Sequence, residues 1–139
     1  MPSIIRYQPV SDDYTTYHLL TPTPTSTDAD EPRATILAQL DDGYVYASIP
    51  DNMQLPQQPT QITVAVVELT DELRDAITAA SPHIDLINQR VRAAIGERYS
   101  LHDEIKLIRT APSPEFSVYN AYVEDCRAWG RAEKAKLGL

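Results

Sequence analysis

The hydrophobic pattern of this 139-residue chain changes its period at Thr70. Before this residue, short apolar and β-branched runs are separated by proline-containing segments, as is typical of strands and their loops. After it, apolar residues recur at helical spacing. The pattern predicts an α+β fold with a β-rich region over residues 1–69 and a helical region over residues 70–139. One compact domain containing both regions is the alternative to two separate ones.

The clearest strand pair is a hairpin over residues 34–49, whose two apolar, β-branched and aromatic runs are joined by a short acidic turn. Gly43, at the third turn position, tolerates the positive φ that a type I turn with a bulge requires. Residues 61–69 predict a third strand that we expect to be well buried, and residues 4–7 and 14–20 predict weaker ones. Together these segments indicate a small antiparallel sheet of three to five strands.

A loop rich in threonine and proline occupies residues 21–32. Proline fixes an extended backbone, and the segment has no large apolar side chain to bury. We therefore expect an extended segment at the surface. A docking arm is the functional interpretation of this loop, and a solvated connection is the alternative.

Helix start signals recur through the second half. Thr70 precedes two acidic residues, and Ser100 precedes Asp103 at the spacing of a capping box. Ser-Pro pairs at 81 and 113 place proline at the first helical position, where its missing N–H is not needed. We therefore predict three or four short helices, with fraying in the basic segment that follows the last apolar stripe. Their apolar stripes are Ile84, Ile87, Val91, Ala94 and Ile95, then Leu101, Ile105 and Ile108, then Phe116, Tyr119, Val123 and Cys126.

Charge and hydropathy argue against several classes of partner. Twenty acidic and twelve basic residues give a net charge of −8, whereas nucleic acids and anionic membranes attract clustered lysine and arginine. The longest apolar run, residues 64–67, is far shorter than a membrane span. The N-terminal residues lack the apolar core of a signal peptide. We therefore expect a soluble intracellular protein that binds neither nucleic acid nor membrane.

The reactive side chains form no recognisable catalytic, cofactor or metal motif. The four glycines cannot build a phosphate-binding loop. None of His18, His83 and His102 has a second histidine or cysteine at ligand spacing. Cys126, the single cysteine, lies on an apolar helix stripe, where a core role is the simplest interpretation. We predict no catalytic residue, cofactor or metal, with a small hydrolase or transferase built on these histidines as an alternative.

Tyr44, Tyr46 and Ser48 share one face of the second hairpin strand. Tyrosine supplies a large contact area at a small entropic cost, so these three residues are the candidate protein-binding surface. The alternative is a sheet face that the helices cover, because an α+β domain must cover at least one face of its sheet.

Several stretches of the helical half resemble small uncharacterised proteins that tailed bacteriophages and prophages encode with their tail-fibre genes. The stretches are residues 69–73, 79–83, 87–91, 98–109 and 119–124. The resemblance covers residues 69–139 and brings no defined functional residue. It implies a tail accessory or tail-fibre assembly protein, present in the bacterial cytoplasm during assembly or in the virion.

These observations favour a non-enzymatic protein that binds a phage tail or tail-fibre protein through its β-rich region. The alternative is a host interaction or regulatory module that self-associates through its helices. The apolar stripe that contains Phe116, Tyr119, Val123 and Cys126 motivates this alternative. The partner is a protein in both cases, and a homo-oligomer is compatible with either.

Overall fold

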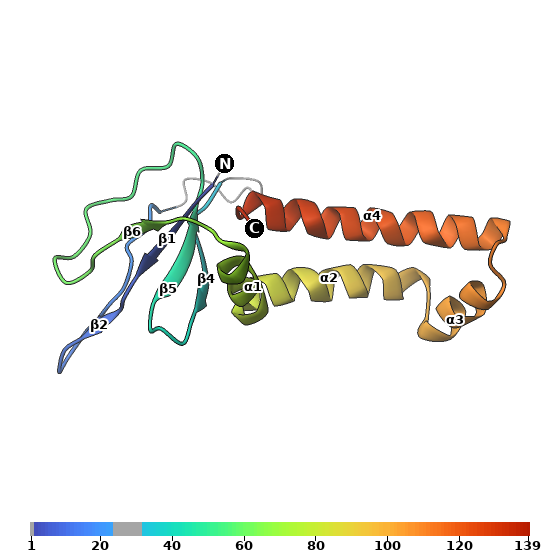
Figure 1. The fold of residues 1–139 in the computed structure, drawn as a ribbon, viewed down its shortest axis with the longest axis horizontal. Helices are drawn as coiled ribbons and strands as arrows, with labels where there is room; N and C mark the ends of the chain where they lie inside the picture. Colours follow the sequence, from blue (N-terminus) through green and yellow to red (C-terminus); the bar gives the residue numbers. More distant parts are fainter. Residues whose placement is uncertain (1, 24–31) are drawn as a thin grey trace. The chain divides into compact units, whose positions relative to one another are not determined.

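The computed structural model describes residues 2–23 and 32–139 and confirms the predicted α+β fold (Figure 1). Within these residues it contains a four-stranded antiparallel sheet, a two-stranded sheet and four helices. Most of the predicted loop at 21–32, namely residues 24–31, lies outside the described residues.

The larger sheet has the strand order β4-β5-β1-β6, and every neighbouring pair is antiparallel. Its strands are β1 (Ser3–Tyr7), β4 (Thr35–Gln39), β5 (Val45–Ile49) and β6 (Ala65–Val67). The hairpin predicted at 34–49 is confirmed as β4 and β5, and Gly43 has the expected positive φ of 82°. The predicted strand at 14–20 shortens to β3 (Thr16–Tyr17), which pairs with β2 (Val10–Ser11).

The chain forms two compact units. Unit 1 comprises Met1–Ile84 and Lys136–Leu139, and unit 2 comprises Asp85–Ala135. The first helix, α1 (Asp71–Ala80), therefore belongs with the sheet although it lies beyond residue 69. Unit 2 is inserted between two segments of unit 1 along the sequence.

Unit 1 buries both faces of its sheet. One face places Ile5 and Ala47 in a core that loop residues such as Leu19 and Ile62 cover. On the opposite face Tyr46 is buried, and α1 packs against β4 with Ile77 fully buried. Burying one large aliphatic side chain contributes about 1.5–3 kcal/mol. Every residue of β5 is buried, because β5 has a strand on each side and covered faces above and below.

Unit 2 consists of an antiparallel helix pair with a short helix at its turn (Figure 1). Its helices are α2 (Pro82–Arg98), which begins in unit 1, then α3 (Leu101–Arg109) and α4 (Pro114–Lys136). The predicted capping box of Ser100 and Asp103 is present, as is the Thr70 cap of α1. The fraying expected after Gly130 is wrong, because α4 continues to Lys136 and Leu137 is buried.

Candidate functional site

The predicted binding face of Tyr44, Tyr46 and Ser48 is not an exposed surface. Tyr46 and Ser48 are each only 2% exposed, and Tyr44 is partly buried with the Arg6 guanidinium 4.4 Å from its ring centre. The Tyr46 hydroxyl donates a hydrogen bond to Asp42 Oδ2 at 2.8 Å. Burial, and then this bond, raise the pKa of Tyr46. The prediction of an exposed binding face is corrected because Tyr46 and Ser48 are buried, as the alternative interpretation of a covered sheet face describes.

The exposed element of the sheet is the edge strand β6. Residues 61–69 were expected to be well buried, yet Ala65 is exposed and the Val66 side chain is 78% exposed. Among the described residues β6 has β1 as its only strand neighbour, so one side of its backbone is unpaired by any strand. Residues 62–67 contain no charge, proline or glycine. An open edge of this composition is a template for a further strand.

The opposite edge of the sheet is protected by its geometry. The register of β4 against β5 shifts between Ile36 and Ala38, which indicates a bulge or irregularity. Bulges disrupt regular pairing with an incoming strand. Of the two edges, β6 is therefore the one suited to strand addition.

A second exposed apolar surface lies on α3, which has no buried residue. Leu101, Ile105 and Ile108 occupy one face at helical spacing and are 47% to 72% exposed. Beside this face, at i+3 from Leu101, Glu104 Oε1 accepts a hydrogen bond from the Tyr119 hydroxyl of α4 at 2.7 Å. This bond raises the pKa of Tyr119, and burial raises it further. We call Leu101, Ile105 and Ile108 the α3 stripe.

Aromatic rings join α4 to the end of α2 and to the connection between α2 and α3. Tyr99 meets Tyr119 edge to face with ring centres 5.0 Å apart, and it lies 5.8 Å from Tyr122. The Arg98 guanidinium stands 4.8 Å from the centre of the Tyr122 ring, and the Tyr122 hydroxyl donates to the carbonyl oxygen of Ala94 at 2.6 Å. Aromatic contacts of this kind add about 0.5–1.5 kcal/mol beyond burial. They hold the end of unit 2 together.

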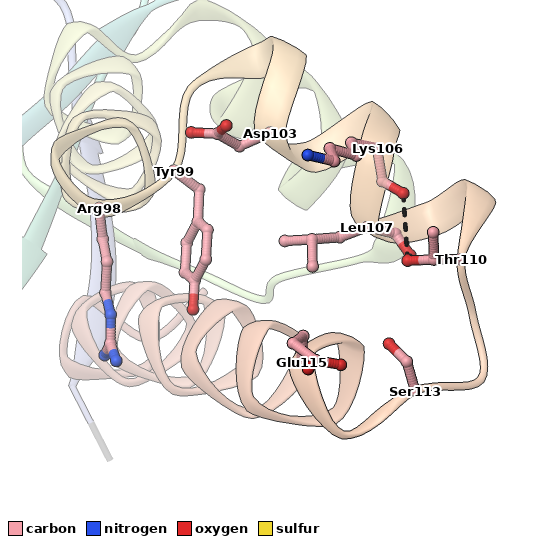
Figure 2. A pocket seen from close by; sticks show the side chains of 8 residues that line it. All are labelled: Arg98, Tyr99, Asp103, Lys106, Leu107, Thr110, Ser113 and Glu115. Atoms are coloured by element: carbon pink, nitrogen blue, oxygen red, sulfur yellow. Dashed lines mark hydrogen bonds between the residues drawn. The ribbon is translucent and has the colours of Figure 1, made fainter.

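A pocket of about 530 Å³ opens between α3 and the start of α4 (Figure 2). Its lining consists of Arg98, Tyr99, Asp103, Lys106, Leu107, Thr110, Ser113 and Glu115. Most of its short polar side chains already bond to helix ends. Asp103 belongs to the Ser100 capping box, and its hydrogen bonds with Ser100 lower the pKa of the Asp103 carboxyl. The Thr110 hydroxyl donates a hydrogen bond to the Lys106 carbonyl, and the Ser113 hydroxyl accepts one from the Phe116 N–H. The described lining brings no nucleophile into a hydrogen bond with a base, which catalysis by a side-chain nucleophile requires.

The histidines and the cysteine do not converge. His18, His83 and His102 are all exposed, and the described residues contain no group of histidine, cysteine and acidic side chains that could hold a metal. Cys126 is half-buried and lines a small apolar pocket of about 250 Å³ with Trp129, so its predicted core position holds only in part. Tyr119 and Val123 of the same stripe are buried within the chain. These two residues are therefore covered, whereas Phe116 and Cys126 of the stripe remain partly exposed.

Comparison with known proteins assigns this chain to no family. No protein-family model, no curated protein and no solved structure matches this chain. In the part of the chain that the structure describes, no helix combines the length and the apolar composition needed to cross a bilayer. The two exposed apolar features, β6 and the α3 stripe, are thus the observations from which function is argued.

Proposed function

We propose that this protein is a non-enzymatic binding protein that takes up a strand of a protein partner along β6. The observation that carries the proposal is the uncharged, apolar edge strand, with Val66 78% exposed and no strand on its outer side among the described residues. In strand addition, main-chain hydrogen bonds supply affinity and alternate side chains supply specificity. The mode needs no reactive group, which agrees with the absence of a catalytic motif in the sequence.

The proposed biological setting is the assembly of a bacteriophage or prophage tail. It derives from the resemblance of residues 69–139 to proteins encoded with tail-fibre genes. A chaperone for a fibre needs an exposed strand edge or groove and needs no catalysis, and the open edge of β6 suits that task. The protein would act in the bacterial cytoplasm during assembly or remain in the virion.

The test compares two substitutions at one exposed position. Val66→Lys places a charge on the edge and blocks strand pairing, whereas Val66→Thr keeps a β-branched side chain there. Each should change the free energy of unfolding by less than about 0.5 kcal/mol, because the side chain is exposed. Tagged versions are expressed in source cells under DNA damage, which induces a prophage, and the bound proteins are identified by mass spectrometry.

Recovery of one tail or fibre protein by the wild type and by Val66→Thr, with its loss in Val66→Lys, is the expected result. Equal recovery by all three versions would show that β6 is not the binding element. Recovery of host complexes alone would argue against the tail setting.

Self-association through the helices is a second candidate, which the exposed α3 stripe favours. The Ile105→Lys substitution should leave folding intact, since Ile105 is half-exposed, and should abolish any dimer that uses this stripe. Sedimentation of the wild type and the variant measures this directly. A wild type that stays monomeric at high concentration removes this candidate.

A further inference from the structure

The net charge of the chain lies entirely in unit 1. Over the residue ranges of the two units, unit 1 carries twelve acidic and four basic residues, while unit 2 carries eight of each. Unit 1 therefore has the whole formal charge of −8, and unit 2 is neutral. Charge of one sign raises the encounter rate with partners of the opposite sign and disfavours like-charged ones.

The charges near β6 are placed at one end of the strand. The strand itself has none, but Glu68 follows it directly, and Asp71 and Glu72 begin α1. All three side chains are exposed. Among the described residues Asp71 pairs with Arg74 at 3.3 Å, and Glu68 and Glu72 have no ion pair. The edge thus combines an apolar centre with an acidic C-terminal end.

We propose that the strand completing this edge is basic at its own N-terminal end: an apolar, β-branched segment preceded by lysine or arginine. This inference rests on the proposed function. Every strand pair of the sheet is antiparallel, and antiparallel pairing is slightly more stable per residue. An added antiparallel strand begins beside Glu68, where its cationic residues meet this carboxylate. A second copy of the chain is disfavoured as the occupant, because it would bring two units of charge −8 together.

Three labelled peptides of matched length test the inference against the full chain. KKTVTVTV carries its charges at the N-terminal end, TVTVTVKK carries them at the C-terminal end, and QQTVTVTV is neutral. Fluorescence anisotropy measures their dissociation constants at low and high salt. We expect KKTVTVTV to bind about threefold more tightly than QQTVTVTV, as an exposed ion pair of lysine with Glu68 allows, with TVTVTVKK between them. High salt should remove most of the difference.

Two variants of equal charge separate a local effect from a global one. Glu68→Gln removes a carboxylate beside β6, and Asp13→Asn removes an exposed one in the turn between β2 and β3. Glu68→Gln should reduce the preference for KKTVTVTV over TVTVTVKK, and Asp13→Asn should leave it unchanged. An equal effect of both variants would overturn the placement of the basic end.

The outcomes distinguish failure of this inference from failure of the proposed function. If all three peptides bind equally and Val66→Lys abolishes binding, strand addition stands and the basic partner is wrong. If Val66→Lys leaves peptide binding unchanged, or if no peptide binds, the edge is not a binding element for such strands and both fail. A dimer of the wild type that Val66→Lys dissociates would identify a second copy as the occupant and overturn the inference.

Discussion

Unit 1 carries the whole net charge of the chain, yet it also holds most of the buried apolar side chains. Of the seventeen buried hydrophobic residues among those described, fourteen lie in unit 1 and three in unit 2. The three in unit 2 are Ile87, Tyr119 and Val123. Unit 2 instead relies on tyrosine contacts, the Glu104 hydrogen bond and a close helix approach at Gly130. The charged unit is thus stabilised by aliphatic side chains buried on both faces of its sheet. The neutral helical unit is stabilised mainly by a few specific contacts between side chains.

The largest expected effect on this comparison comes from a substitution of Leu37, which is almost fully buried in β4. Leu37→Ala should lower the free energy of unfolding of unit 1 by about 3 kcal/mol, from lost burial plus the cavity left behind. Ile36→Ala, at the half-exposed neighbour, should cost less than about 1 kcal/mol. Amide hydrogen exchange measures both, with protection falling in β1, β4 and β5 but not across unit 2. An equal loss of amide protection in α4 would mean that the two units unfold together, which would contradict the contrast drawn between them.

A pair of glycines tests the close approach in unit 2. A Cβ at Gly130 would lie 2.8 Å from Val91 Cγ2, whereas a Cβ at Gly96 would meet nothing within 4 Å. Gly130→Ala should therefore destabilise unit 2 by about 1–2 kcal/mol through overpacking. Gly96→Ala should stabilise it by about 0.5–1 kcal/mol, because alanine has the higher helix propensity. Urea unfolding followed by far-UV circular dichroism gives both values. Stabilisation by Gly130→Ala would show that α2 and α4 separate easily.

The smallest of the three effects concerns Tyr119. Tyr119→Phe removes the hydrogen bond to Glu104 and should cost about 1 kcal/mol near neutral pH. The folded-state pKa of Tyr119 lies above its usual value, first because of the Glu104 bond and then because of burial. Its contribution is complete below the unfolded-state pKa of about 10 and is lost as pH rises through the raised folded-state pKa.

The stability of unit 2 should therefore decline above about pH 10 less steeply in Tyr119→Phe than in the wild type. Thermal unfolding at a series of alkaline pH values measures the slopes. Tyr122→Phe is the matched variant, since burial raises the pKa of that tyrosine as well and its hydroxyl bonds a backbone carbonyl instead of a carboxylate. Parallel slopes in the wild type and Tyr119→Phe would contradict the role given to the Glu104 bond.

Features set by a few neighbouring residues could be predicted from the sequence. The capping box at Ser100 and the positive φ of Gly43 each depend on groups within four positions. The fold class followed because the period of the apolar pattern differs between the two halves. In each case the local backbone, rather than a distant contact, decides the conformation.

Burial of individual strands could not be predicted, because it depends on distant pairing. β1, from the start of the chain, pairs between β5 and β6 and leaves residues 65–67 at the edge. The same pairing places Tyr46 in the interior, which removed it as a binding residue. The α3 stripe was visible in the sequence, but its exposure was not, because it depends on which distant residues pack against α3. The spacing of apolar residues does not show which face of an amphipathic helix packs against its neighbour.

The return of the chain to unit 1 after α4 has a consequence for the order of folding. Leu137 is buried, and Gly138, at a φ of 83°, brings its backbone close to the Pro2 carbonyl and Ile4. During synthesis on the ribosome, Pro2 and Ile4 emerge before unit 2, whereas Leu137 and Gly138 emerge after it. The helical unit can therefore complete its contacts while the sheet unit still lacks its last piece. Unit 1 therefore lacks the contacts of Leu137 and Gly138 until unit 2 has been synthesised.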